Sequence, residues 1–209
     1  MKTSAFIAML GLAAPLAMAD NLKYEVFNPG HNSIFAVTSV IVEGDKEVML
    51  VDSQFQRNDA ETLVQKIKAI GKPLNTIYIS HGDPDYYFGL ETLTQAFPDA
   101  KVLASAPTVA HIEQTKDAKL AFWGPKMGAD VPAKTIVPDV LKGDSLMLEG
   151  QKLQVVGLEG KQPDRSFVWI PSIKAVVGGV VVAENIHLWM ADTQTPQSHA
   201  DWLTTLHSI

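Results

Sequence analysis

The densest cluster of ionisable side chains follows residues 76–79, a short apolar run typical of a buried strand. After this run, His81, Asp83 and Asp85 alternate along a loop that leads into a helix. A loop that leaves the carboxyl end of a buried strand can project alternate side chains toward one point above the sheet. Imidazole and carboxylate groups that converge in this way can hold a divalent cation. The sequence therefore predicts a metal site formed by His81, Asp83 and Asp85.

A second interpretation of the same loop needs no ligand. Asp83 and Asp85 can cap the amino end of the following helix, while His81 makes a local hydrogen bond. The next side chain, Tyr86, is either a partly buried aromatic residue or a phenol that donates a hydrogen bond to a substrate carbonyl. The residues alone leave both interpretations open.

The elements that position this loop alternate between strand and helix, as hydrophobic spacing indicates. The expected strands cover residues 24–27, 33–42, 48–51, 76–79 and 101–104, and then 145–148, 152–158, 166–170 and 175–182. The expected helices cover residues 60–70, 87–96, a segment from 107 onward and 198–209. Two β-rich halves, each with helices, predict an α/β (α+β) fold in which stacked sheets lie between helical layers.

Composition narrows the functional classes. A chain of 209 residues that is 46% hydrophobic predicts one folded domain with a sizeable core. Seventeen Lys and Arg residues stand against 23 Asp and Glu, and the net charge is −6. No basic stripe is present to neutralise phosphates, which excludes nucleic acid as an expected partner. We expect a small-molecule substrate or ligand.

The amino terminus has the pattern of a secretory signal. Lys2 precedes an apolar run over residues 5–16, and Ala17-Met18-Ala19 then forms a small-x-small cleavage site. The apolar run is too short to span a membrane. We expect residues 1–19 to be a signal peptide and residues 20–209 to form the mature domain, without a membrane span, in the periplasm or outside the cell.

The loop after residue 79 resembles the metal-binding loop of the metallo-β-lactamase superfamily, which reads His-x-His-x-Asp-His after such a strand. His81 matches the first histidine and Asp85 matches the aspartate, while Asp83 and Tyr86 stand at the second and third histidines. Upstream, the strand over residues 48–51 leads into Asp52, which is similar to the family residue that shapes the floor of the site. The resemblance covers essentially the whole mature chain. It implies a four-layer αββα sandwich, incomplete at its C-terminal end.

Three departures weaken the metal centre that the resemblance implies. Lys161, or as the second choice Glu159, falls where the family has a later histidine, and Gly178-Gly179 stand where a Gly-Asp pair bridges two metal ions. The sequence also ends before the loop that carries the last metal-binding histidine. A protonated lysine has no lone pair to donate. The resemblance therefore implies one weakly held zinc, manganese or iron ion, or no ion at all, in which case Lys161 pairs with Asp83 or Asp85.

Further side chains are expected near the pocket. His31 lies on an early hairpin loop, which in this family often overhangs the site. His187, Trp189 and Asp192 alternate after the last strand, near the expected mouth of the pocket. No role is assigned to the remaining histidines, His111, His199 and His207.

Two functions follow as hypotheses. In the first, the chain is an exported hydrolase that attacks an ester, lactone or amide bond with a metal-activated water. His81, Asp83 and Asp85 then hold the ion, Asp85 also orients the water, and Tyr86 stabilises the oxyanion. In the second, the chain is a non-catalytic member of the fold that binds a small ligand or a partner in a metal-free pocket.

Overall fold

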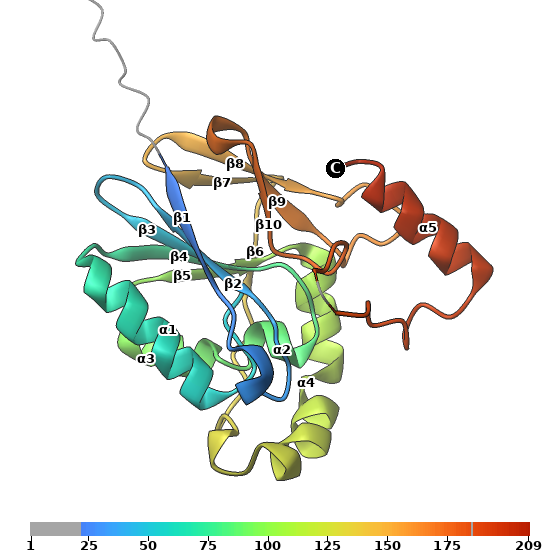
Figure 1. Cartoon of the computed structure of the whole chain (residues 1–209), viewed down its shortest axis with the longest axis horizontal. Helices are drawn as coiled ribbons and strands as arrows, with labels where there is room; N and C mark the ends of the chain where they lie inside the picture. Colours follow the sequence, from blue (N-terminus) through green and yellow to red (C-terminus); the bar gives the residue numbers. More distant parts are fainter. Residues whose placement is uncertain (1–21, 185) are drawn as a thin grey trace, which may run out of the picture.

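Two β-sheets packed face to face form the centre of the molecule in the computed structural model, which describes residues 22–184 and 186–209 (Figure 1). The predicted signal peptide, residues 1–19, lies outside the described residues. Within the described part of the chain, no helix is both long and apolar enough to cross a lipid bilayer.

The larger sheet has six strands in sequence order. They are β1 (Lys23–Phe27), β2 (Ser39–Glu43), β3 (Val48–Val51), β4 (Leu74–Ile79), β5 (Lys101–Ala104) and β6 (Asp139–Val140). β1, β2 and β3 pair antiparallel, whereas β3, β4, β5 and β6 pair in parallel. β4 therefore lies between two parallel neighbours, and the loop that follows it emerges near the middle of the sheet edge.

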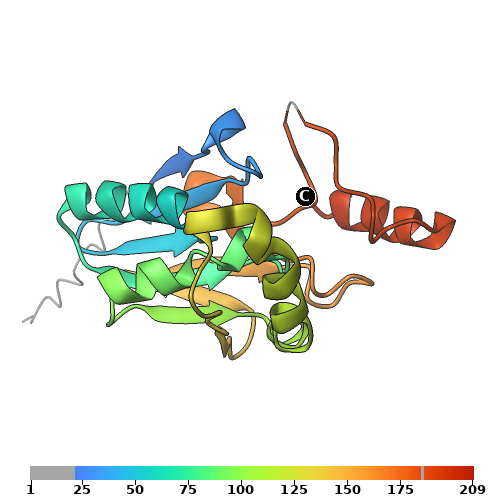
Figure 2. The ribbon, with the colours of Figure 1, turned by 90° about the horizontal axis from the view of Figure 1, so that it is seen from below.

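Helices cover one face of this sheet (Figure 2). They are α1 (Arg57–Ile70), α2 (Pro84–Tyr87), α3 (Leu90–Ala96) and α4 (Ala106–Met127). In α1, Ala60, Leu63, Val64 and Ile67 recur at helical spacing and are buried. They share one core cluster with sheet residues such as Ile77, so the helical layer is held to the sheet by apolar packing.

The smaller sheet covers the opposite face. Its antiparallel strands are β7 (Ser145–Leu148), β8 (Gln151–Val156), β9 (Phe167–Ile170) and β10 (Ala175–Val177), in the order β10-β9-β8-β7. Val42 and Met49 of the larger sheet share a second core cluster with Leu153 and Val155 of the smaller one. Successive strand residues point to opposite faces, so each central strand serves both cores.

The last helix, α5 (Pro196–Leu206), packs beside the smaller sheet (Figure 1). Its buried Trp202 contacts Phe167 and Val181, and the indole N–H donates to the carbonyl of Val181 at 3.1 Å. The mixed α/β sandwich predicted from the sequence is confirmed.

Two expected strands are much shorter than predicted. The strand expected over residues 33–42 begins at Ser39, because the Gln56 side-chain oxygen accepts from Ser33 Oγ and the Ile34 N–H and holds that stretch as a loop. The strand expected over 175–182 ends at Val177, because Gly178 and Gly179 have φ values of +72° and +79°.

The helix expected over residues 87–96 is divided. Pro84 begins α2, and the chain then reaches Gly89, whose N–H donates to the carbonyl of Gln54 at 2.9 Å. A Cβ at Gly89 would lie 1.9 Å from the carbonyl oxygen of Ser53. This close backbone approach needs glycine and separates α2 from α3.

Candidate functional site

The predicted site loop leaves the carboxyl end of β4, where open parallel sheets bind their ligands. Ser80 and His81 are buried at the end of the strand, and Asp83 and Asp85 enter the short helix α2. Asp83 is the N-cap residue of α2, but its side chain makes no capping hydrogen bond. Capping therefore does not explain this carboxylate.

A buried polar network forms the floor beneath the loop. Asp52 has φ +64° after β3, and its carboxylate accepts from the Ser80 N–H at 2.8 Å and from Ser80 Oγ at 2.7 Å. Ser80 Oγ in turn accepts from the Gly179 N–H at 2.8 Å. Burial raises the pKa of Asp52 to about 7, although both hydrogen bonds from Ser80 lower it. The network joins the ends of β3, β4 and β10.

His81 is neutral and held in one orientation. It is 3% exposed, and burial lowers its pKa to about 4, while the nearby Asp83 raises it and Arg165 lowers it. Its Nδ1 accepts from the Asp83 N–H at 3.2 Å, so the ring proton lies on Nε2. The Tyr86 ring packs edge-on at a centroid distance of 5.2 Å.

Asp83 is bound by a lysine outside the predicted site residues. Lys119 Nζ of α4 lies 2.9 Å from Asp83 Oδ1, 2.9 Å from the Gly82 carbonyl oxygen and 3.0 Å from His111 Nε2. Burial raises the pKa of Asp83, but the interactions with His81 and Lys119 outweigh burial and leave this pKa below its ordinary value. The predicted partner, Lys161, is exposed.

This arrangement corrects two expectations. The lysine paired with Asp83 is Lys119, and the histidine beside it is His111, to which the sequence analysis assigned no role. Both lie on α4 eight residues apart, a spacing that places two side chains on one side of a helix. That spacing is the signal that could have identified the pair.

Asp85 and Tyr86 lie beside the Asp83 cluster. Burial, and then the charge of Asp83, raise the pKa of Asp85 to about 7. Burial also raises the pKa of the Tyr86 phenol, and Asp85 and Asp52 add to this effect. The Tyr86 carbonyl accepts from the Ser53 N–H at 2.8 Å, which anchors α2 to the end of β3.

Arg165 is a buried cation that the sequence analysis also missed. It is 6% exposed, its Nη2 lies 2.5 Å from Asp192 Oδ2, and its guanidinium lies 4.8 Å from the centre of the Trp202 ring. Its charge lowers the pKa of both His81 and Tyr86, so it faces the site loop. The Asp164-Arg165 pair immediately before Ser166 was the available signal.

The remaining candidates fall into two groups. Asp192 comes to the site through Arg165, and its charge raises the pKa of His81. His31 lies exposed on the 3-10 helix η1 (Gly30–Asn32), while His187 and Trp189 are exposed on the segment before α5, with Trp189 65% exposed. The structure thus places Asp192 beside Arg165 at the site, whereas His31, His187 and Trp189 lie exposed and do not join it.

The donor groups of the loop do not fit a divalent metal ion. Among residues 22–184 and 186–209, no group of three His, Cys, Asp or Glu side chains is close enough to hold one. Asp83 and His111 are bound by Lys119, and His81 Nδ1 accepts from the backbone. The predicted set of His81, Asp83 and Asp85 is therefore not assembled as a coordination site.

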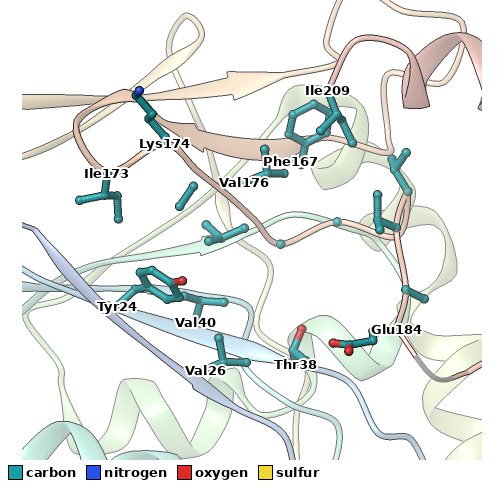
Figure 3. Close-up of a pocket in the computed structure, with 17 residues that line it drawn as sticks. Tyr24, Val26, Thr38, Val40, Phe167, Ile173, Lys174, Val176, Glu184 and Ile209 are labelled. Atoms are coloured by element: carbon teal, nitrogen blue, oxygen red, sulfur yellow. The ribbon is translucent and has the colours of Figure 1, made fainter.

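A separate groove lies between the edge strands of the two sheets, β1 and β10 (Figure 3). Its volume is about 430 Å³, and most of its lining is apolar, including Val26, Val40, Phe167 and Val176. Gly178 and Gly179 line one side and also border the Asp52 and Ser80 network. None of the ionisable residues of the site loop lines this groove.

Comparison with known proteins agrees with this architecture. The family model described as the metallo-beta-lactamase superfamily matches residues 33–208. A curated relative, the uncharacterized protein YobT of Bacillus subtilis (strain 168), is 36% identical over 73 residues, which are 35% of this chain and 31% of YobT. The match thus spans about a third of that protein.

Solved structures show the same fold at low sequence identity. The BLEG-1 B3 metallo-beta-lactamase superposes with a TM-score of 0.65 at 15% identity. The superposition covers 88% of this chain and 84% of the BLEG-1 chain. The metallo-beta-lactamase from Pontibacter korlensis gives 0.63 at 20% identity, with 90% and 79% covered. DIM-1 metallo-beta-lactamase gives 0.60 at 22% identity, with 90% and 79% covered.

Proposed function

The chain belongs to the metallo-β-lactamase superfamily, and from this premise we propose that it is an exported hydrolase that cleaves an ester, lactone or amide bond of a small molecule. Members of this superfamily typically bind divalent metal ions. The observation that carries the proposal is the arrangement of Asp85, His81, Tyr86 and Arg165 around one loop end, in the position where folds of this kind bind ligands.

Asp85 is the proposed general base. Its pKa of about 7 leaves a substantial fraction of the carboxyl ionised at neutral pH, and that fraction can accept a proton from the attacking water. A carboxyl with an ordinary pKa is a weaker base, so burial beside Asp83 favours this role.

Proton donors on the same loop are the proposed oxyanion stabilisers. Neutral His81 carries a proton on Nε2, and the phenol of Tyr86 stays protonated because burial raises its pKa. Hydrogen bonds from such fixed donors to the developing oxyanion lower the barrier to carbonyl attack. Arg165, which contacts Asp192 and Trp202, adds a positive charge near these donors.

The test is hydrolysis by the full mature chain in the presence of a chelator. Nitrophenyl esters, an aliphatic lactone and nitrocefin are the substrates. Asp85→Asn should reduce kcat/KM by a factor of about 10² to 10⁴, the usual contribution of general acid-base catalysis. The matched control is Asp117→Asn on α4, whose side chain is 86% exposed and pairs with Lys116. Turnover by Asp85→Asn equal to that of the unaltered chain would remove Asp85 from the mechanism.

A non-catalytic function has one specific observation in its favour. The Asp83 carboxylate is already bound by Lys119 and so is not free to take part in proton transfer. If the chain is a binding protein, small carbonyl compounds or carboxylates should raise its Tm without being cleaved. Ligand-dependent stabilisation with no product, measured on the same substrates, would favour this alternative over hydrolysis.

A further inference from the structure

The side chain of Lys119 reaches from α4 into the loop that carries the family's metal ligands. α4 runs beside α2 (Figure 1), and Lys119 Nζ contacts Asp83, Gly82 and His111 at 2.9 to 3.0 Å. We propose that the Lys119 ammonium takes the place of a divalent metal ion in this chain, as a built-in cation with the ligand set of a metal.

The ammonium group uses its full donor capacity in this position. A protonated lysine has three N–H donors and no acceptor. The three partners are a carboxylate oxygen of Asp83, the backbone carbonyl oxygen of Gly82 and the ring nitrogen Nε2 of His111. Oxygen and imidazole nitrogen atoms, which accept these hydrogen bonds, are also the ligand atoms that bind zinc and manganese in proteins. One positive charge thus occupies Asp83, one of the three predicted metal ligands, together with two further oxygen and nitrogen atoms that could bind a metal ion.

The Lys119–Asp83 contact is partly buried, about as much as the Lys72–Glu43 pair and more than the Lys66–Glu25 pair. The side chain of Lys119 is 19% exposed and that of Asp83 is 29% exposed, compared with 38% and 51% for Lys66 and Glu25. Screening by water and salt is weaker for a partly buried pair, so the Lys119 contact holds its partners more firmly.

Two glycines near the cluster leave space that a side chain would fill. A Cβ at Gly82 would lie 2.7 Å from Cδ2 of His111, so the absence of a side chain there allows the imidazole to reach Lys119. At the bridging position of the family, a Cβ on Gly179 would lie 2.7 Å from the Ser166 carbonyl oxygen. That position has no room for the carboxylate that a two-metal site requires.

The test uses zinc and, separately, manganese, titrated into the full mature chain by calorimetry. Lys119→Met releases Asp83 and His111 and should bind zinc at least about tenfold more tightly than the unaltered chain, a difference of about 1.4 kcal/mol. Lys116→Met is the matched control, since Lys116 lies on the same helix and pairs with exposed Asp117. It should bind zinc as weakly as the unaltered chain. Equal zinc affinity in the unaltered chain and Lys119→Met overturns the proposal.

A second measurement on the unaltered chain keeps the test decisive if Lys119→Met does not fold. Long-range proton–nitrogen NMR spectra should show His111 protonated on Nδ1 and unprotonated on Nε2, because Nε2 accepts from Lys119. One equivalent of zinc should leave both signals in place. Zinc-dependent shifts of the His111 nitrogens would contradict the proposal. Neither readout depends on activity, so this inference stands or fails separately from the proposed hydrolysis.

Discussion

Burial and neighbouring charges together determine the charge states of the ionisable side chains in the site loop. Burial lowers the pKa of His81 to about 4 and raises the pKa of Asp85 to about 7, so it favours the neutral form of both. Asp83 lies between them and stays charged because Lys119 is bound to it. At neutral pH the loop therefore combines a fixed ion pair with two groups suited to moving or donating protons.

The low pKa of His81 predicts how stability depends on pH. The folded pKa of about 4 lies below the ordinary value of 6.5, so between these pH values the unfolded chain binds a proton that the folded chain excludes. The contribution of His81 to stability is therefore complete above pH 6.5 and is lost as pH falls toward 4, by a few kcal/mol at about 1.4 kcal/mol per pKa unit.

His81→Gln should remove this pH dependence. The difference in free energy of unfolding between the unaltered chain and the variant, measured by urea denaturation, should shrink as pH falls from 6.5 to 4. The comparison is needed because Asp52 and Asp85, with raised pKa values, change stability in the opposite sense over this range. His31→Gln, at an exposed position, is the control. A difference that is constant with pH would contradict a buried neutral His81.

Two turns, one from each sheet, contact each other at the end of the molecule opposite the site loop. Glu149, in the turn between β7 and β8, accepts from the backbone N–H groups of Asp45, Lys46 and Glu47 at 3.1, 2.5 and 2.7 Å. These residues form the turn between β2 and β3, so one carboxylate joins the two sheets. A Cβ at Gly44 would lie 2.5 Å from Glu149 Oε1, so a side chain there would displace the Glu149 carboxylate from its present position.

Glu149→Ala should lower the Tm, because it leaves three backbone N–H groups without this acceptor. The hydrogen bond from Lys46 is the largest cause that lowers the pKa of Glu149 below 4.5, so the Tm difference should be full above that pH and decrease as pH falls below it. Glu159→Ala, on an exposed loop, is the control for thermal unfolding. Equal melting of both variants would show that the contact does not stabilise the fold.

Sequence patterns predicted the elements better than their ends. The turn at Glu149-Gly150 is confirmed by φ values of +50° and +81°, and the helix ending at Gly71 is confirmed by φ +75°. The end of β10 at Val177 and the break at Gly89 were missed. The Gly89 N–H donates to the Gln54 carbonyl, and the Gly179 N–H after β10 donates to Ser80 Oγ; local spacing does not encode either contact.

At the scale of the whole molecule, long-range contacts assemble the site from four parts of the chain. β3 leads into Asp52, β4 leads into His81, α4 contributes Lys119, and the stretch before β9 contributes Arg165. Arg165 also connects the site to Asp192 and Trp202 near the end of the described chain. The last segment therefore takes part in the electrostatics of the loop.

The predicted signal peptide implies export and cleavage of the chain. Expressed with its own amino terminus in a Gram-negative host, the protein should be recovered from the periplasm with residue 20 as its first residue, as measured by intact mass. Leu10→Arg interrupts the apolar run and should leave unprocessed protein in the cytoplasm. Ala110→Arg, at an exposed position on α4, should be exported normally. An uncleaved mass for the unaltered chain would contradict the predicted cleavage after Ala19.

The sequence by itself determined the fold family, the alternation of strands and helices, and the loop in which His81, Asp83 and Asp85 lie. The alternation of elements and the place of the loop are encoded in local spacing, which fixes the side of a strand or helix on which a residue lies. The fold family follows from the resemblance of that loop to the family's metal-binding motif. Only the tertiary structure decided which cation meets Asp83. Lys119 and Lys161 have the same side-chain chemistry, but the packing of α4 beside the loop brings Lys119 to 2.9 Å and leaves Lys161 exposed.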